Sequence, residues 1–154
     1  MPDNEYCAPA AEWDASWAAL EQEVIELVNA ERASGANCGG TQMPATSPLK
    51  ADPALRCAAR VHTKDMVDND YFDHTNLQGE GPGPRIEKAG YSWSTYGENI
   101  AAGNATAEAT VQQWMESPGH CSNIMNPDFE DIGVGYQPGG AFSHTWTQVF
   151  GRTF

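Results

Sequence analysis

The hydrophobic residues change their spacing along this sequence, from helical spacing in the first part to alternation in the last third. The segment from about 16 to 34 repeats large apolar residues every three or four positions, namely Trp17, Leu20, Val24, Leu27 and Val28. That period predicts a helix, with Ser16 as its cap and Gly35 at its end. The stretches DIGVGYQP at 131–138 and HTWTQVFGRTF at 144–154 instead alternate on either side of a turn, which predicts a β-hairpin.

Two further long helices are predicted between these segments. The helix over about 52–69 has Asp52 as its N-cap and Pro53 in its first turn, and the helix over about 106–116 follows Thr106. Ser117 is the expected N-cap of a short helix to about 125, which gives this serine a structural role rather than that of a nucleophile. The other expected elements are loops at 1–13 and 35–48, a short helix at 84–89 and an extended segment at 96–103.

This order of elements predicts an α+β fold. Helices come first, strands come last, and one extended segment lies between helices, so we expect helices packed over a mostly antiparallel sheet. The chain has 154 residues and neither an internal repeat nor a low-complexity tract. That length suits a single domain with one substantial core.

The charge of the chain argues against two classes of partner. There are 21 acidic and 8 basic residues, for a formal net charge of −13. Such a surface repels nucleic-acid phosphates and anionic lipids, so we expect neither as a partner. No apolar run is long enough to cross a membrane, so no transmembrane segment is expected.

Four cysteines allow two disulfides in three possible connectivities. None of them has the CxxC spacing of a redox or zinc-ribbon site. The first twelve residues contain no basic segment followed by an apolar run, so no signal peptide is expected in them. Paired cysteines favour an oxidising, extracytoplasmic location.

One histidine falls on a helix face that should be buried. The apolar face of the 52–69 helix consists of Leu55, Ala58, Ala59, His62 and Met66. A histidine in such a position is more often hydrogen-bonded to backbone than bound to a ligand. We therefore expect His62 to be a structural residue.

Three stretches concentrate polar side chains among apolar neighbours: YFDHTN at 71–76, YGENIA at 96–101 and SPGHCSNIM at 117–125. They contribute His74, Glu98 and His120, which are 24 and 22 residues apart. Two imidazoles and a carboxylate could bind a first-row metal with water as a fourth ligand, or act as general acid and base. Their spacing alone does not establish that they converge.

Several ordered motifs resemble the bacterial branch of the CAP superfamily. These motifs are GENIAAG, VQQWMESPGHCSNIMNPDFEDIGVGY and TWTQVFG, with LVNAERASGA and LRCAARVHTKDMVDNDYFDHTN in the amino-terminal half. The superfamily groups cysteine-rich secretory proteins, antigen 5 and plant pathogenesis-related proteins. The similarity runs from about residue 20 to 151, nearly the whole chain.

The resemblance implies an α/β/α sandwich with a small, mostly antiparallel sheet, and a secreted protein with a central surface cleft. In animal and plant members the cleft holds two histidines and two glutamates, sometimes with a divalent ion. The first histidine and first glutamate of that set match His74 and Glu98. The second glutamate is replaced by Ser117, beside Glu116, and the second histidine is replaced by Thr145, beside His144. A shift of one residue in a strand reverses the direction of the side chain, so the usual set is not intact.

His120 belongs to the bacterial pattern and could project into the same cleft. The resemblance therefore implies a metal site of His74, Glu98 and His120, with zinc a better candidate than calcium. The same three residues are the catalytic candidates. Asn99 and Asn123 are expected to fix loops by hydrogen bonds rather than to act in catalysis.

The cysteines also fit the resemblance, because bacterial relatives combine a Cys-Gly-Gly loop with a Gly-His-Cys helix start. This implies disulfides Cys38–Cys121 and Cys7–Cys57. The second would attach an amino-terminal arm, residues 1–15, to a single CAP domain of residues 16–154. The first, Cys38–Cys121, would close a loop of about 80 residues, which stabilises a protein by roughly 4 kcal/mol in the chain-entropy model.

Family members act mostly by binding, so the expected function is that of a secreted, monomeric binding module. Its partner would be a small apolar ligand, a glycan or an extracellular protein, with a divalent metal as an additional ligand. The alternative is a peptidase-like hydrolase that uses Glu98 with His74 and His120. A third alternative is a structural domain of the cell envelope without a ligand.

Overall fold

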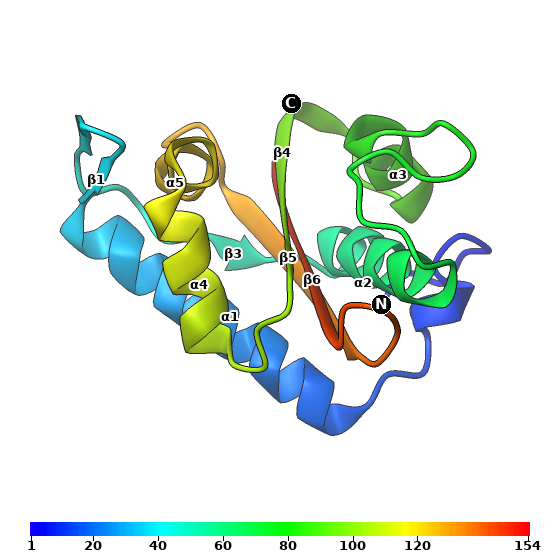
Figure 1. The fold of residues 1–154 in the computed structure, drawn as a ribbon. Helices are drawn as coiled ribbons and strands as arrows, with labels where there is room; N and C mark the ends of the chain where they lie inside the picture. The colour runs from blue at the N-terminus through cyan, green and yellow to red at the C-terminus, as the bar shows by residue number, and fades with distance from the viewer.

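A four-stranded sheet forms the middle layer of the structure, a computed structural model that describes residues 1–154. Its strands lie in the order β3-β5-β6-β4, with β3 parallel to β5 and the other pairs antiparallel. Helices α2 and α3 cover one face of this sheet, and α1, α4 and α5 cover the other (Figure 1). The predicted α+β sandwich of three layers is confirmed.

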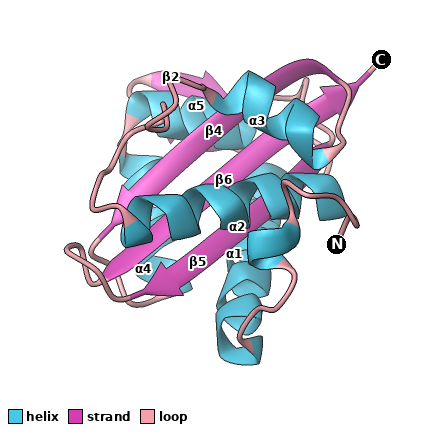
Figure 2. Ribbon diagram, turned by 90° about the vertical axis from the view of Figure 1, so that its right-hand side faces the viewer, coloured by secondary structure: helices cyan, strands magenta, loops and turns pink.

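The elements follow the order expected from the sequence. The helices are α1 Ala15–Ser34, α2 Pro53–Asp68, α3 Pro82–Ala89, α4 Ala107–Glu116 and α5 Pro118–Met125, after a 3-10 turn at Ala8–Ala10. The strands of the main sheet are β3 Lys50–Ala51, β4 Trp93–Ala102, β5 Asp131–Pro138 and β6 His144–Thr153. Figure 2 looks onto the face of the sheet that α2 crosses. None of these helices has the length and apolar character needed to span a bilayer.

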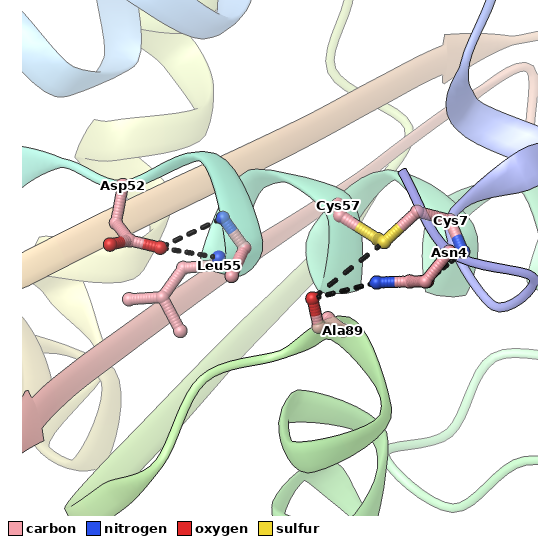
Figure 3. Close-up of a disulfide and its surroundings, with 7 residues drawn as sticks. Asn4, Cys7, Asp52, Leu55, Cys57 and Ala89 are labelled. Carbon is pink, nitrogen blue, oxygen red and sulfur yellow. Dashed lines mark hydrogen bonds between the residues drawn. A yellow bond between two sulfur atoms is a disulfide. The ribbon is translucent and has the colours of Figure 1, made fainter. Parts of the chain in front are cut away.

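Helix ends are set by local side-chain chemistry. Asp52 caps α2, because its carboxylate accepts the backbone N–H groups of Ala54 and Leu55 at 2.8 and 3.0 Å (Figure 3). Thr106 caps α4 through the N–H of Ala109, as predicted. The cap predicted for α1 is wrong by two positions: Asp14 accepts the N–H of Ser16, which lies inside the helix.

Three other details differ from expectation. The segment expected to be a loop contains a small hairpin, β1 Ala36–Cys38 with β2 Thr41–Met43. Strand β3 was not predicted, because two residues are too few to produce a periodic pattern. Ser117 stands at the N-cap position of α5, but its side chain makes no capping hydrogen bond.

The alternation in β6 separates two hydrophobic cores. Trp146 and Phe150 pack on the side of α1, α4 and α5, together with Trp114 of α4. Val149 points to the opposite side and packs with Leu55 of α2. Each face of the sheet therefore has its own core, and a side chain on the sheet belongs to one core or the other by its parity.

Glycines in β5 allow α2 to lie directly on the sheet. A Cβ added to Gly133 would stand 2.1 Å from the carbonyl carbon of Leu55, and one added to Gly135 would stand 2.6 Å from that of Ala59. Both obstructing groups are helix backbone, which cannot move aside. The glycines alternating with large residues in this strand are therefore required by the close approach of the helix.

Both disulfides expected from the resemblance are present. Cys7 is bonded to Cys57 and Cys38 to Cys121, and no cysteine is free. The first bond attaches the amino-terminal arm to α2, and Asn4 of the same arm donates to the carbonyl of Ala89 at the end of α3 at 3.2 Å (Figure 3). The second bond attaches the β1–β2 hairpin to α5.

Candidate binding site around His74, Glu98 and Arg85

His74 and Glu98 are in direct contact. His74 follows α2 in the loop at 71–81, and Glu98 lies in β4 opposite Val149, so its side chain is on the α2 and α3 side of the sheet. The Nδ1 atom of His74 is 2.8 Å from Oε1 of Glu98. The carboxylate is buried with 1% of its side chain exposed, whereas the imidazole is 46% exposed. The pair thus joins a buried acceptor to a group at the surface.

Arg85 is the third member of this cluster and was not predicted from the sequence. From α3, its Nη2 atom donates to both oxygens of Glu98 at 2.9 and 3.1 Å and to the carbonyl of His74 at 2.7 Å. Its side chain is 1% exposed. Arg85 is next to Ile86 on the buried face of α3. A charged residue on a buried helix face is unusual, and this was the sequence feature that could have identified Arg85 as a site residue.

The contacts stabilise the charged forms of His74 and Glu98. Burial alone would raise the pKa of Glu98, but the hydrogen bond from His74 and the positive charge of Arg85 outweigh it and lower the pKa. The hydrogen bond to Glu98 raises the pKa of His74 despite partial burial. Glu98 is therefore an ionised acceptor at neutral pH, held between two donors.

His120 comes from the helix layer on the other side of the sheet. It belongs to α5, whose buried residues Cys121, Ile124 and Met125 pack in the core shared with α1 and α4. Burial and the nearby charge of His74 lower the pKa of its imidazole. The backbone carbonyl of His120 accepts a hydrogen bond from Asn99 at 3.2 Å. No hydrogen bond joins its imidazole to Glu98 or His74.

Asn99 and Asn123 were expected to fix loops by hydrogen bonds, and their hydrogen bonds instead hold the helix α5 against β4. The amide of Asn123 donates to the side chain of Asn99 at 2.9 Å, and Asn99 donates to Gln148 at 3.0 Å. Asn99 and Gln148 are paired across β4 and β6, so both face α5. These amides form a structural link between β4 and the helix that carries His120.

The two positions that depart from the usual family set, and the acidic and histidine residues beside them, do not extend the cluster. Thr145 is fully buried in β6. The Nδ1 atom of His144 lies 2.7 Å from the hydroxyl of Tyr136, so this imidazole has its own partner. Ser117 joins α4 to α5, and Glu116 accepts a hydrogen bond from Gln112 on the surface.

The donor atoms limit how a metal could bind. No group of three or more His, Cys, Asp or Glu side chains is placed to hold a metal ion. Both oxygens of Glu98 already accept hydrogen bonds, and the Arg85 cation lies 2.9 Å away, so Glu98 could bind an ion directly only by giving up one of these bonds. Nε2 of His74 and the imidazole of His120 have no hydrogen-bond partner, so they are the donors open to a metal. The three-ligand centre stays a prediction.

His62 is the structural residue that its position predicted. It is 1% exposed, and its Nε2 atom lies 2.8 Å from the carbonyl oxygen of Asp73. Burial lowers the pKa of this imidazole to about 4, so it is neutral at physiological pH. The bond holds the loop that carries His74 against α2.

Comparison with known proteins gives the same family as the sequence motifs. The family model described as "Cysteine-rich secretory protein family" matches residues 25–150. The uncharacterized protein YkwD of Bacillus subtilis is 42% identical over 135 residues, covering 88% of this chain and 48% of that protein. The uncharacterized membrane protein YlbC of the same organism is 27% identical over 136 residues, covering 86% of this chain and 37% of that protein. The chain thus spans half or less of these relatives.

Solved structures share the fold. An extracellular protein of Bacillus anthracis that contains an SCP domain superposes with a TM-score of 0.75 at 27% identity, covering 93% of this chain and 45% of that one. An outer surface protein of Borrelia burgdorferi has a TM-score of 0.70 at 23% identity, covering 86% of this chain and 95% of that one. These neighbours are extracellular or surface proteins.

Proposed function

Because this chain belongs to the cysteine-rich secretory protein family, or CAP family, we propose that it is an extracellular binding domain whose partner is a protein. The partner would contact the loop at 71–81 and the adjoining turn between β5 and β6. The observation that carries this proposal is the exposure of large apolar side chains beside His74. Two of the four large exposed hydrophobic residues of the chain, Phe72 and Leu77, lie within three positions of His74.

The apolar side chains in this region suit a protein interface. Phe72 is 41% exposed and Leu77 is 61% exposed. The ring of Phe72 lies 5.7 Å from that of Phe142, in the turn that joins the two strands. Aromatic side chains are enriched in protein interfaces and commonly supply most of their binding energy. We name this region, formed by Phe72, Leu77 and Phe142, the Phe72 surface.

The state of Glu98 supports binding over hydrolysis. A general base must accept a proton, and its pKa should be close to the working pH. Glu98 has a lowered pKa and both of its oxygens are engaged by His74 and Arg85. This carboxylate is better suited to orient His74 than to remove a proton from water.

The proposed domain would bind a divalent metal through two of its histidines, His74 and His120. Nε2 of His74 and the imidazole of His120 would bind the ion, with zinc preferred for its affinity for imidazole. Glu98 would then orient His74 through Nδ1, as carboxylates do behind histidine ligands. A rise in melting temperature with zinc that both His74→Ala and His120→Ala abolish would support this site.

Site-specific photo-crosslinking tests the protein-binding proposal. A photoreactive residue replaces Phe72 in one sample and Glu23, an exposed residue of α1 on the far side of the sheet, in the control. We expect one extracellular protein to be cross-linked from position 72, and excess unlabelled wild type to prevent the reaction. Excess Phe72→Asp protein should not prevent it. Equal cross-linking from both positions, or none that wild type suppresses, would refute the proposal.

A second candidate function is binding of a small apolar ligand. A hollow of about 320 Å³ lies between α1 and α4, where Leu27, Val111 and Met115 form part of its lining. Extraction of the purified protein with organic solvent, followed by mass spectrometry, tests this candidate. A stoichiometric lipid that Val111→Trp displaces would favour it.

A further inference from the structure

A second hollow on the α2 and α3 side of the sheet shares the loop at 71–81 with the proposed protein interface but contains none of the side chains of the Phe72 surface. Its volume is about 410 Å³, within the range of small-ligand sites. The amino-terminal arm, α2, the loop at 71–81 and α3 each contribute to its wall. Its lining includes Arg85 and His62 but none of His74, Glu98, His120 or the Phe72 surface.

Buried polar atoms of three lining residues make no close hydrogen bond in the protein, although the Arg85 guanidinium lies near enough to the Tyr6 hydroxyl to oppose the rise in its pKa. These atoms are Nε and Nη1 of Arg85, Nδ1 of His62 and the hydroxyl of Tyr6. Arg85 and His62 are each 1% exposed, so bulk water does not satisfy them. Buried polar groups are nearly always hydrogen-bonded, and a set of exceptions in one place indicates a bound ligand or water.

The three residues require a ligand that both donates and accepts hydrogen bonds. Nε and Nη1 of Arg85 are donors only. His62 is neutral and its Nε2 donates to the carbonyl of Asp73, so its Nδ1 is an acceptor. Burial raises the pKa of Tyr6 to about 12, so its hydroxyl keeps its proton and can do either. Hydroxyl groups meet all of these requirements.

The charges around the hollow exclude an anionic ligand. Lys64 is paired with Asp68 at 2.8 Å, and Lys88 is paired with Glu80. Arg85 is neutralised by Glu98, and Asp65 adds a further negative charge to the lining. The lining therefore has no excess positive charge with which to attract a carboxylate or phosphate.

The remaining lining combines an apolar wall with amides. Pro9 and Val61 provide the apolar part. Asn76 and Gln78 line the rim, and the side-chain amide of Gln78 has no hydrogen-bond partner. These features match a sugar ring. The apolar surface suits the C–H groups of the ring, and the amides and carboxylates suit its hydroxyl groups. The small net charge of the lining suits a neutral molecule.

We propose that this hollow binds a neutral saccharide. The ring would lie against Val61 and Pro9, with its hydroxyl groups linked to Arg85, His62 and Tyr6 through ordered water, because the unpartnered atoms of these residues lie beneath the surface of the hollow. The site is separate from the Phe72 surface and does not require the protein partner proposed above.

Titration of the isotopically labelled chain by NMR, with isothermal calorimetry, tests the saccharide site. The probes are glucose, N-acetylglucosamine, cellotriose and chitotriose, with glucose 6-phosphate and inorganic phosphate as charged comparisons. We expect at least one neutral probe to shift the amide signals of the lining residues with a saturable curve, and the phosphates to leave them unchanged. Tighter binding of a trisaccharide than of its monosaccharide would identify a glycan chain, and equal binding a free sugar.

Matched variants locate the binding. Gln78→Trp places a bulky ring at the mouth of the hollow from an exposed loop position, and we expect it to weaken binding at least tenfold. Tyr6→Phe removes one hydroxyl and should weaken it about fivefold, the value of one hydrogen bond of about 1 kcal/mol. Gln42→Trp, at an exposed position of the β1–β2 hairpin, and Phe72→Asp should leave it unchanged.

Three results would overturn the proposal: no neutral probe shifts the lining signals at millimolar concentration, phosphate binds more tightly than the neutral sugars, or Gln78→Trp binds as wild type does. Loss of the photo-crosslink at position 72 with saccharide binding intact would refute the protein-binding function alone. The two proposals therefore fail in different ways.

Discussion

Replacing Arg85 with methionine should expose how much of the stability of this domain depends on one buried cation. The substitution keeps the length of the side chain but removes the charge that faces Glu98. Both partners are 1% exposed, so water cannot replace the lost contacts. Breaking a buried pair by removing one partner costs about 3–5 kcal/mol. We expect about 3 kcal/mol, the lower end of that range, because His74 still donates to Oε1 of Glu98.

The pH dependence distinguishes this electrostatic cause from a loss of packing. In the wild type the lowered pKa of Glu98 contributes stability above the unfolded pKa, and this contribution is lost as the pH falls through the folded value. In Arg85→Met, burial would raise the pKa of Glu98 above its unfolded value. The variant should therefore be most destabilised at pH 7, and the difference should shrink toward about 1 kcal/mol as the pH falls and Glu98 becomes protonated, first in the variant and then in the wild type.

Urea unfolding followed by tryptophan fluorescence, with the disulfides intact, measures both quantities. Arg152→Met is a matched control, because Arg152 pairs with Glu130 at 3.4 Å and both side chains are about half exposed. That control should change the free energy of unfolding by less than about 0.5 kcal/mol. A loss below about 1 kcal/mol for Arg85→Met at pH 7, or an equal loss at pH 4, would show that the reasoning is wrong.

Three further outcomes are expected. Replacing both Cys38 and Cys121 with alanine should lower the free energy of unfolding by about 4 kcal/mol in a denaturant titration, because the bond joins residues 83 apart; a loss below about 1 kcal/mol would contradict this. Gly133→Ala should cost about 3 kcal/mol by the same measurement, because the added Cβ meets helix backbone, and an unchanged stability would mean that α2 can shift. An NMR titration should give His74 a pKa above, and His120 a pKa below, the usual histidine value; the reverse order would contradict the contacts described.

The regular elements could be predicted because each is specified by residues close together in the sequence. The cap at Asp52 and the alternation in β6 are local signals, and both elements lie where they were expected. Some errors were local, such as the cap at Asp14 and the β1–β2 hairpin, and one arose because the decisive contact is distant. Strand β3 exists only because Lys50 and Ala51 pair with β5, some 80 residues later, as the partners Asp131 and Ile132 show.

The candidate site was predictable to a smaller extent. The family resemblance drew attention to His74 and Glu98, which the structure places 2.8 Å apart. Arg85 was missed because its role depends on α3 packing beside β4, which no local pattern specifies. The grouping of His120 with the other two stays a prediction, because the parity of β4 directs Glu98 to the side of the sheet opposite α5.

Each disulfide joins elements on one side of the sheet only. Cys7 and Cys57 lie in the core of α2 and α3, whereas Cys38 and Cys121 lie in the core of α1, α4 and α5. No disulfide passes from one core to the other, so outside the polypeptide itself the two helix layers are held together by their packing on the sheet between them. A pulling force that lifts one helix layer away from the other would therefore be resisted by side-chain packing on the two faces of the sheet and not by either disulfide, so both sulfur bonds would stay intact while the layers came apart.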